Sequence, residues 1–353
     1  MNSARQLEPD IVKAAAIVAI VLVHADAVLP GPGRIGFGSV ASVALALFFL
    51  VSGHVAGRRL LAPNADVRDV AARVVPLLWL YLLWQPVVLA QRMLLNGLQV
   101  RPFDPVGEAS RFLAAPVRPN GELWYLWALA IHLVVIAATR RARPVVVLGP
   151  AVAVFVLCNG FGRMLLGDDG WHLLGPGLQG MPQFAFFTLL GARLRTLRPA
   201  QRPEALVVIA LCAVLCSVGL HGLSSAVTAT PPLETLAGVV AALALAHLIA
   251  PTWTGAVLGF IGQRSTAPYL THMSILTLLV GALVLTGRTP TGGGRLPALA
   301  VMVALAVLVP VMTLDTVENS RFRWLFRTPS VIEEAVIPAV PIVIRRWSKH
   351  RTR

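Results

Sequence analysis

Residues 10–24 read DIVKAAAIVAIVLVH. With their flanks they form an apolar segment that is long enough to cross a bilayer as a helix. Lys13 and His24 are eleven residues apart, which is three full helical turns, so their side chains lie on one helix face about 16 Å apart. Because a charge inside a spanning helix costs about 2.5 to 3.5 kcal/mol on insertion scales, this ionisable pair indicates a functional site.

The whole chain has the composition of a multi-pass membrane protein. Of its 353 residues, 56% are hydrophobic and only 13% are charged, and the mean hydropathy is +0.74. We therefore predict an all-α fold, a polytopic membrane protein with about ten transmembrane helices. The predicted spans are residues 9–29, 39–61, 74–95, 122–139, 144–161, 182–197, 204–221, 234–250, 266–286 and 296–316. A secretory signal in the first span is the alternative, which Lys13 disfavours because it interrupts the apolar run.

Basic residues are distributed unevenly between the two sides of this arrangement. Of the 30 lysines and arginines, 21 fall on the side of the N terminus and 8 on the other, with Lys13 set aside. The positive-inside rule then places both termini in the cytoplasm, and we predict a location in the inner (plasma) membrane. The net charge of +14 is thereby an orientation signal, and no nucleic-acid partner is expected. The three cysteines lie in apolar stretches, which predicts reduced thiols and no metal site.

Two long connections and a tail lie outside these spans. Residues 96–121 and 162–181 are assigned to the outside and are candidate walls of a substrate site, with surface linkers as an equal alternative. Residues 329–344 are too short and too rich in proline to span, and a basic end follows them. We therefore predict a membrane domain at residues 1–328 and a cytoplasmic basic tail at 329–353, held at the interface by anionic membrane lipids.

Five short motifs follow one another along the chain. They are Asp10 with Lys13 and His24; Phe48-Phe49-Leu50-Val51-Ser52-Gly53-His54; the segment from Arg68 through Arg73 to Pro76; Gly121-Glu122-Leu123-Trp124-Tyr125-Leu126; and Ser265 to His272 with Tyr269. In this order and at these spacings they resemble the acyltransferase 3 family of integral membrane acyltransferases, in its stand-alone form. The resemblance covers residue 5 to about residue 276, and its specificity comes from the ordered set.

The resemblance implies a ten-helix membrane domain that takes an acyl group, commonly acetyl, from coenzyme A at the cytoplasmic face. It also implies delivery of that group to a hydroxyl of an extracytoplasmic or lipid-linked sugar, glycan or glycolipid, with no cofactor beyond the acyl-CoA donor. The family's Arg and His pair maps onto Lys13 and His24, and its Ser-Gly-Phe motif maps onto Ser52 and Gly53. The chain departs from the family at Lys13, where Lys replaces Arg, and at His54, where His replaces Phe.

The chemistry of acyl transfer to a hydroxyl is consistent with these residues. An imidazole has an ordinary pKa near 6.5 and suits a general base, which we assign to His24. Lys13 would meet the phosphates of the donor, and Asp10, one turn away, would orient Lys13. The donor site would also include the residues Arg68, Arg73 and Ser52. The acceptor site would include the residues Trp124, Tyr125 and His272.

Each candidate also has a structural explanation. Lys13 can extend to the inner headgroups, His24 and His272 can bond across the bundle, and Ser52 can permit close helix approach. Trp124 and Tyr125 can anchor a helix at the membrane interface. A secondary transporter of a lipid-linked sugar or small anion is the alternative function, and consumption of acyl-CoA by the purified protein distinguishes the two. The acceptor, the acyl chain (acetyl, succinyl or longer) and the oligomeric state stay open at this stage.

Overall fold

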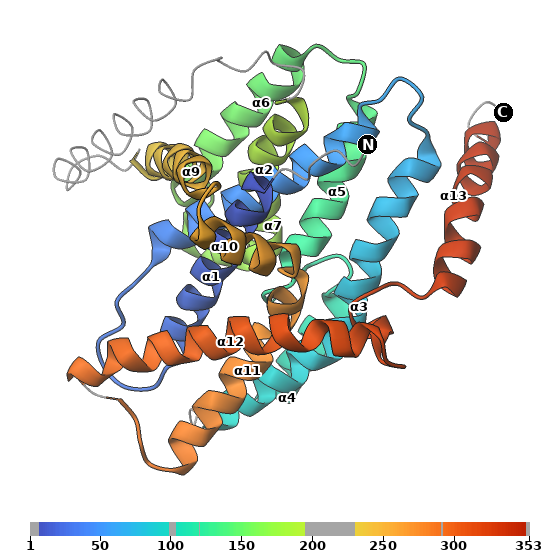
Figure 1. The fold of residues 1–353 in the computed structure, drawn as a ribbon. Helices are drawn as coiled ribbons and strands as arrows, with labels where there is room; N and C mark the ends of the chain where they lie inside the picture. The colour runs from blue at the N-terminus through green and yellow to red at the C-terminus, as the bar shows by residue number, and fades with distance from the viewer. Residues whose placement is uncertain (1–6, 99–103, 120, 195–229, 291, 351–353) are drawn as a thin grey trace.

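A computed structural model shows the fold of the chain as a bundle of helices (Figure 1). It describes residues 7–98, 104–119, 121–194, 230–290 and 292–350. The α-helices are α1 (Glu8–Val28), α2 (Gly38–Leu60), α3 (Val67–Leu98), α4 (Pro105–Ala114), α5 (Trp124–Ala138), α6 (Pro144–Val156), α7 (Gly162–Arg193), α9 (Thr230–Ile249), α10 (Trp253–Gln263), α11 (Thr266–Leu285), α12 (Arg295–Glu318) and α13 (Ser330–His350). Three short turns of other helical types are η1 (Leu157–Phe161), η3 (Gly292–Gly294) and η4 (Arg323–Leu325).

Six of the described helices are long and apolar enough to cross a membrane, and the bent pair of α6 and α7 raises this number to seven if it counts as one span. α5 is apolar but has only 15 residues. The all-helical, multi-pass architecture is thus confirmed in the described part of the chain, whereas the count of ten spans is not. The predicted span at 204–221 lies outside the described residues.

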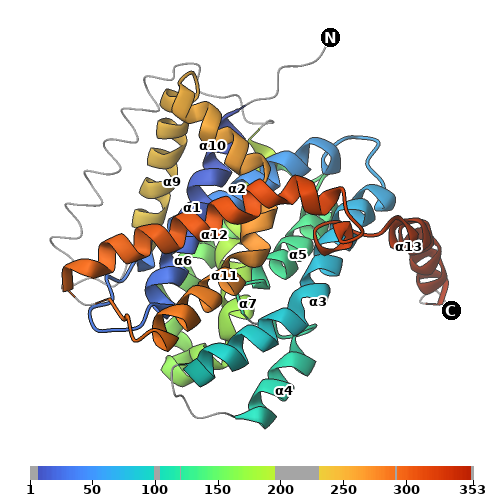
Figure 2. The ribbon, with the colours of Figure 1, turned by 60° about the horizontal axis from the view of Figure 1, so that its bottom comes forward.

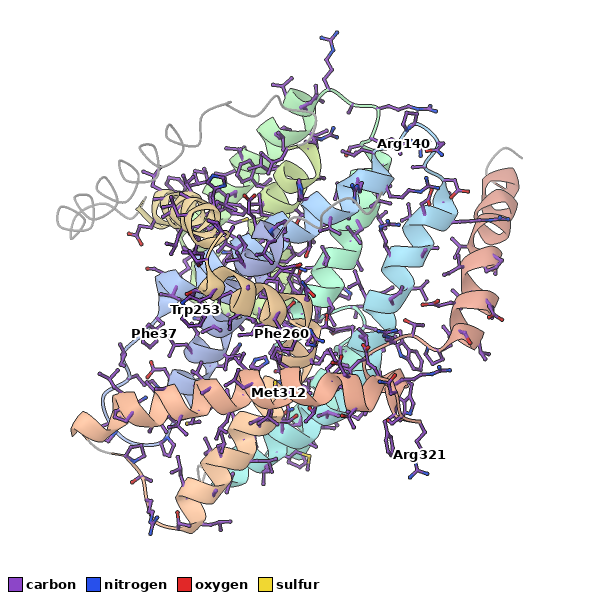
Figure 3. All side chains as sticks on the ribbon, in the orientation of Figure 1. Phe37, Arg140, Trp253, Phe260, Met312 and Arg321 are labelled. Atoms are coloured by element: carbon purple, nitrogen blue, oxygen red, sulfur yellow. The ribbon has the colours of Figure 1, made fainter. Side chains whose placement is uncertain are left out.

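The outer surface of the bundle is apolar. Figure 3 labels Trp253, Phe260 and Met312 on α10 and α12, and these side chains are 79%, 43% and 70% exposed. Water would make such exposure unfavourable over a whole helix face, whereas lipid chains solvate it at no cost. The exposed apolar faces therefore fit a protein whose solvent is the bilayer.

α1 lies within the bundle and contacts α2, α9, α10, α11 and α12. Its contact with α10 is close, because a Cβ at Gly262 would overlap the backbone of Asp10. α2 and α7 approach each other in the same way. A Cβ at Gly53 or Gly191 would overlap the backbone of the partner helix, and one at Gly57 would lie 2.6 Å from the Cα of Ala192. Glycine at these positions is thus required by helix packing, as small residues are in membrane proteins.

α3 begins earlier than its sequence suggests. The third span was predicted to begin at residue 74, but the chain is helical from Val67. The reason is a reciprocal cap, in which the Asp66 N–H donates to the Asp69 carboxylate and the Asp69 N–H donates to that of Asp66, at 2.9 and 3.0 Å. Arg68 and Arg73 therefore lie on the first turns of a helix.

Two other connections also contain helices. The stretch 162–181 was expected to be a loop because it is rich in glycine and proline, but it forms most of α7, after the π-helical turn η1. The helix is broken at Gly167 and Gly175, both with φ of 68°, a conformation that glycine adopts readily. In the connection 96–121, α4 is capped by Asp104, whose carboxylate accepts from the Gly107 N–H.

The predicted tail forms one helix despite its prolines. α13 stands at the edge of the bundle beside α3 in both orientations (Figures 1 and 2). The segment before it is tied to α3 because Trp84 Nε1 donates to the Leu325 carbonyl at 2.8 Å. The prolines therefore do not interrupt the helix, and α13 is not among the described helices that could cross a membrane. Its place at a membrane interface stays a prediction.

Candidate active site

The N-terminal end of α1 carries an ion pair. Lys13 Nζ lies 2.7 Å from Asp10 Oδ1, and the Lys13 side chain is 22% exposed. Asp10 is buried, because α10 packs directly on its backbone at Gly262. The predicted pairing of Asp10 with Lys13 is present in the structure, at the i,i+3 spacing that brings two helical side chains together.

Near the C-terminal end of α1, His24 forms a pair with a histidine of α11. The His24 ring centroid lies 5.1 Å from that of His272, with the planes inclined at 45°. His272 is buried on α11, and its Nδ1 lies 2.9 Å from the Pro268 carbonyl and 2.8 Å from the Tyr269 carbonyl. A carbonyl only accepts, so Nδ1 is the donor and Nε2 keeps its lone pair. Among the described residues this Nε2 has no hydrogen-bond partner.

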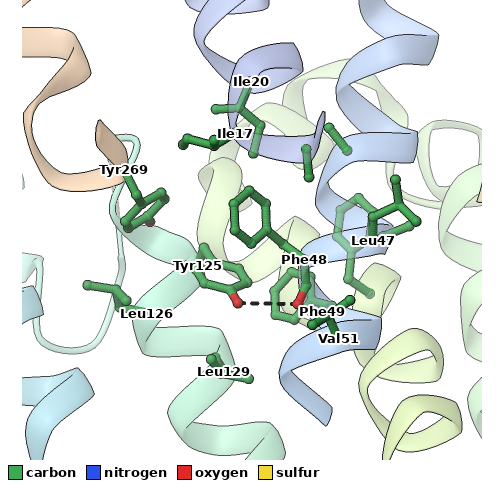
Figure 4. Close-up of a cluster of buried hydrophobic side chains, with 14 of the residues drawn as sticks. Ile17, Ile20, Leu47, Phe48, Phe49, Val51, Tyr125, Leu126, Leu129 and Tyr269 are labelled. Carbon is green, nitrogen blue, oxygen red and sulfur yellow. Dashed lines mark hydrogen bonds between the residues drawn. The ribbon is translucent and has the colours of Figure 1, made fainter. Parts of the chain in front are cut away.

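Ser52 and Tyr125 form a second polar contact inside an aromatic cluster. Their hydroxyl groups lie 2.6 Å apart, and the Tyr125 hydroxyl also lies 3.4 Å from the Phe48 carbonyl, the contact drawn as a dashed line in Figure 4. Trp124 is only 8% exposed and packs against Phe49. The structure therefore places Trp124 and Tyr125 in the core, and places Ser52 against Tyr125.

A polar group beside Tyr269 was missed by sequence reasoning. The Tyr269 hydroxyl donates to the backbone carbonyl of Glu122 at 2.8 Å. With the Gln91 amide oriented to satisfy its neighbours, its nitrogen donates to Glu122 Oε1 at 3.0 Å and its oxygen accepts from the Ser274 N–H at 3.0 Å. The Gly121–Leu126 motif contains Glu122 and could have drawn attention to it. Its partners on α3 and α11, however, come from distant parts of the chain.

The arginines of α3 are not joined to Lys13 by the described contacts. Arg68 is exposed, and Arg73 donates to the Asp69 carbonyl of its own helix at 3.2 Å. Arg59 of α2 lies 2.7 Å from the Asp69 carboxylate. A cationic surface thus forms at the start of α3, with Arg59 as an additional member.

Two cavities open at opposite ends of α1. One, of about 330 Å³, is lined by Glu8 and Val12 of α1 together with His54 and mostly apolar side chains of α9; at its edge His247 Nδ1 lies 2.8 Å from Glu8 Oε1. The other, of about 500 Å³, is lined by Ala27 and Val28 of α1 and by polar side chains. Lys13 and His24 lie between the two cavities in sequence and along the helix.

The remaining histidines have different roles. His132 is held on both ring nitrogens, by Thr188 Oγ1 and the Met181 carbonyl at 2.8 Å each, as in a structural role. His54 lines the 330 Å³ cavity, at the position where the chain departs from the Ser-Gly-Phe motif. His221 lies outside the described residues.

Comparison with known families identifies the chain. Residues 6–315 match the acyltransferase domain model of the acyltransferase 3 family, which is most of the chain and includes all the predicted site residues. No curated protein matches the chain. The helical architecture with several candidate membrane spans agrees with this match. The chain therefore belongs to the acyltransferase 3 family and is a membrane acyltransferase.

Proposed function

We propose that the protein transfers an acyl group, acetyl being favoured, from cytosolic acyl-CoA to a hydroxyl of an extracytoplasmic or lipid-linked sugar, glycan or glycolipid. The observation that carries the proposal is the contact between His272 of α11 and His24 of α1, the helix that has a cavity at each end. Polar groups at membrane depth are retained mainly where they line such spaces or pair with one another. The protein acts in the plasma membrane with both termini in the cytoplasm, and acyl-CoA is a substrate, with no further cofactor.

In the proposed reaction His24 is the general base. The acceptor hydroxyl oxygen attacks the thioester carbonyl carbon while its proton passes to His24. The C–S bond then breaks, and coenzyme A leaves as a thiolate that takes up the proton. His272 positions His24, because its own Nδ1 is fixed by two carbonyls and its ring lies against the His24 ring.

The phosphate-bearing end of the donor is proposed to lie at the Lys13 end of α1. In this proposal Lys13 supplies positive charge there and Asp10 holds its ammonium in place, while Arg68 and Arg73 add positive charge from the start of α3. The proposal keeps Ser52 on the donor side, and keeps Trp124 and Tyr125 on the acceptor side as walls of the site. Both aromatic side chains are buried, so they would shape the site from below its surface.

The experiment is acyl-CoA consumption by the full chain, purified in detergent and mixed with an extract of cell-envelope glycolipids. We expect thiol release that depends on the extract, and acylated glycolipids by mass spectrometry. His272→Asn should lower kcat more than it raises the KM for acyl-CoA, since the residue positions the base. His172→Ala on the exposed face of α7 is the matched control and should behave as wild type. No consumption of acyl-CoA would favour transport instead.

The proposed sidedness is tested separately. A single cysteine at Ser110 on α4 should react with an impermeant maleimide added to intact cells, and one at Ala142 only after the cells are opened. Ser110 is exposed and Ala142 is half-buried. Labelling of position 142 from outside would invert the arrangement and place the donor site on the wrong face.

A further inference from the structure

The 500 Å³ cavity at the C-terminal end of α1 is built from arginines. Arg34 comes from the loop after α1, Arg92 from α3 and Arg111 from α4, so three separate segments contribute one guanidinium each. Asn96 adds an amide to the same lining. An assembly of guanidinium groups around a space of this size is suited to a carboxylate or a phosphate, which accept paired N–H donors.

The positive charge in this cavity exceeds the negative charge. Glu108 is 5% exposed and is the acidic residue of the lining. It lies 3.2 Å from Arg92 Nε and 2.5 Å from Arg111 Nη1, while Arg34 Nη2 donates to the Ala27 carbonyl at 2.7 Å. The lining thus contains three guanidinium groups and one carboxylate, while Glu122 acts on Arg92 from outside the lining. Glu108 therefore fixes two of the arginines without neutralising the site.

The cavity lies one helical turn from the proposed base. Ala27 and Val28 line it, and they follow His24 by three and four residues, so all three share a face of α1. One turn rises about 5.4 Å, which is within the size of a sugar ring. Arg92 also follows Gln91, the residue that joins Glu122 to Ser274 on the helix of His272.

The loop that carries Arg34 is anchored to the same end of α1. Arg295 Nη2 lies 2.8 Å from Asp26 Oδ1, and both residues are buried. The other Asp26 oxygen accepts from the N–H groups of Ile35 and Gly36 at 3.1 and 3.0 Å. Arg34 is adjacent to these bonds, so the loop presents its guanidinium from a fixed backbone.

We propose that the acceptor of the acyl group is anionic, with a carboxylate or phosphate bound among Arg34, Arg92 and Arg111 and with its hydroxyl directed to His24. This inference rests on the proposed acyl transfer and names its substrate class, an acidic sugar or a sugar phosphate. The negative group binds at the arginines, and the reacting oxygen lies one turn deeper along α1. A neutral sugar of the same size has no negative group and cannot make this contact with the arginines.

Binding of small probes tests the site without catalysis. Sodium phosphate and sodium glucuronate, at constant ionic strength, should each raise the Tm of the full chain in detergent, and glucose at the same concentration should not. Arg34→Gln and Arg111→Gln should weaken probe binding about tenfold or more. Arg288→Gln removes an exposed arginine outside the cavity and is the matched control. Arg34 makes no ion pair with Glu108 in the described contacts, so its variant should fold.

The outcomes separate the two proposals. Response to phosphate alone indicates a sugar phosphate, and response to glucuronate indicates an acidic sugar. Equal binding of glucose, or unchanged binding in both arginine variants, overturns the inference. If acyl-CoA is consumed with neutral glycans as well as with acidic ones, the acyltransferase proposal stands and the anionic acceptor fails. If the probes bind as expected but acyl-CoA is never consumed, the anion site stands and its assignment to an acyl acceptor fails.

Discussion

The two ends of α1 hold their charges in different ways. At the N-terminal end, Lys13 and Asp10 form a local pair three residues apart, and Lys13 keeps partial exposure. At the C-terminal end, Asp26 pairs with Arg295 from α12 and accepts from the loop after α1, with all the side chains buried. A local pair can rearrange when a ligand arrives, whereas a pair that joins three segments fixes their positions. The first suits contact with a mobile donor, and the second suits a preformed acceptor site.

The largest effect is expected for His24→Ala. Removal of a general base lowers the rate about 100-fold or more, while the bundle keeps its fold because the side chain is only partly buried. Acyl-CoA turnover with a glycolipid acceptor is the measurement, beside a Tm to confirm folding. More than a tenth of wild-type turnover would show that His24 is not the base.

A stability effect of comparable size is expected for Asp26→Asn. Breaking a buried ion pair from one side leaves Arg295 uncompensated and costs about 3 to 5 kcal/mol of the free energy of unfolding. Lys13→Ala, which breaks the pair at the other end, should cost less, because the Lys13 side chain is partly exposed. Unfolding in mixed micelles compares the two variants directly. Equal losses of stability would show that the two ion pairs at the ends of α1 do not differ in their contribution to the fold.

A smaller effect on the donor is expected at Lys13. Lys13→Ala should raise the KM for acyl-CoA about tenfold with little change in kcat, since the ammonium is proposed to meet phosphate. Lys13→Arg keeps the charge and should stay within about twofold of wild type. A dephospho analogue of the donor gives the complementary measurement. An unchanged KM in Lys13→Ala would exclude a phosphate contact.

The smallest effect is expected at the Ser52–Tyr125 contact, which lies between the two ends. Ser52→Ala and Tyr125→Phe delete the same hydrogen bond, and each should cost about 1 kcal/mol of stability. The double variant should cost little more than either single variant. If Ser52 also contacts the donor, only Ser52→Ala raises the KM for acyl-CoA. An equal rise in both variants would indicate that the bond, and not the serine, affects the site.

The span positions were predictable where an apolar run has clear ends. α1, α2 and α11 begin and end within about two residues of the expected limits, because length and hydropathy alone define such helices. The stretch 162–181 was misread, since glycine and proline indicate loops in water but are accommodated by kinked helices in membranes. The start of α3 was misplaced because the Asp66–Asp69 cap was not recognised.

The sequence predicts individual site residues and local pairs, but not the contacts between residues of different helices. The local pair of Asp10 and Lys13 follows from helical spacing, so the sequence contained it. The contact of His24 with His272 depends on how α1 packs against α11, which no local pattern encodes. Gln91 and Ser274 were missed for the same reason, and so was the meeting of three arginines from three segments at one cavity.

The glycine contacts between α2 and α7 have a consequence for motion. Where Gly53 and Gly191 lie against carbonyl groups, no layer of side chains separates the two backbones. Sliding or tilting one helix on the other would create steric overlap, so the two helices move as one rigid unit. An opening that admits a donor or releases a product must then come from other elements that move relative to this unit, such as the parts of α7 beyond its breaks at Gly167 and Gly175.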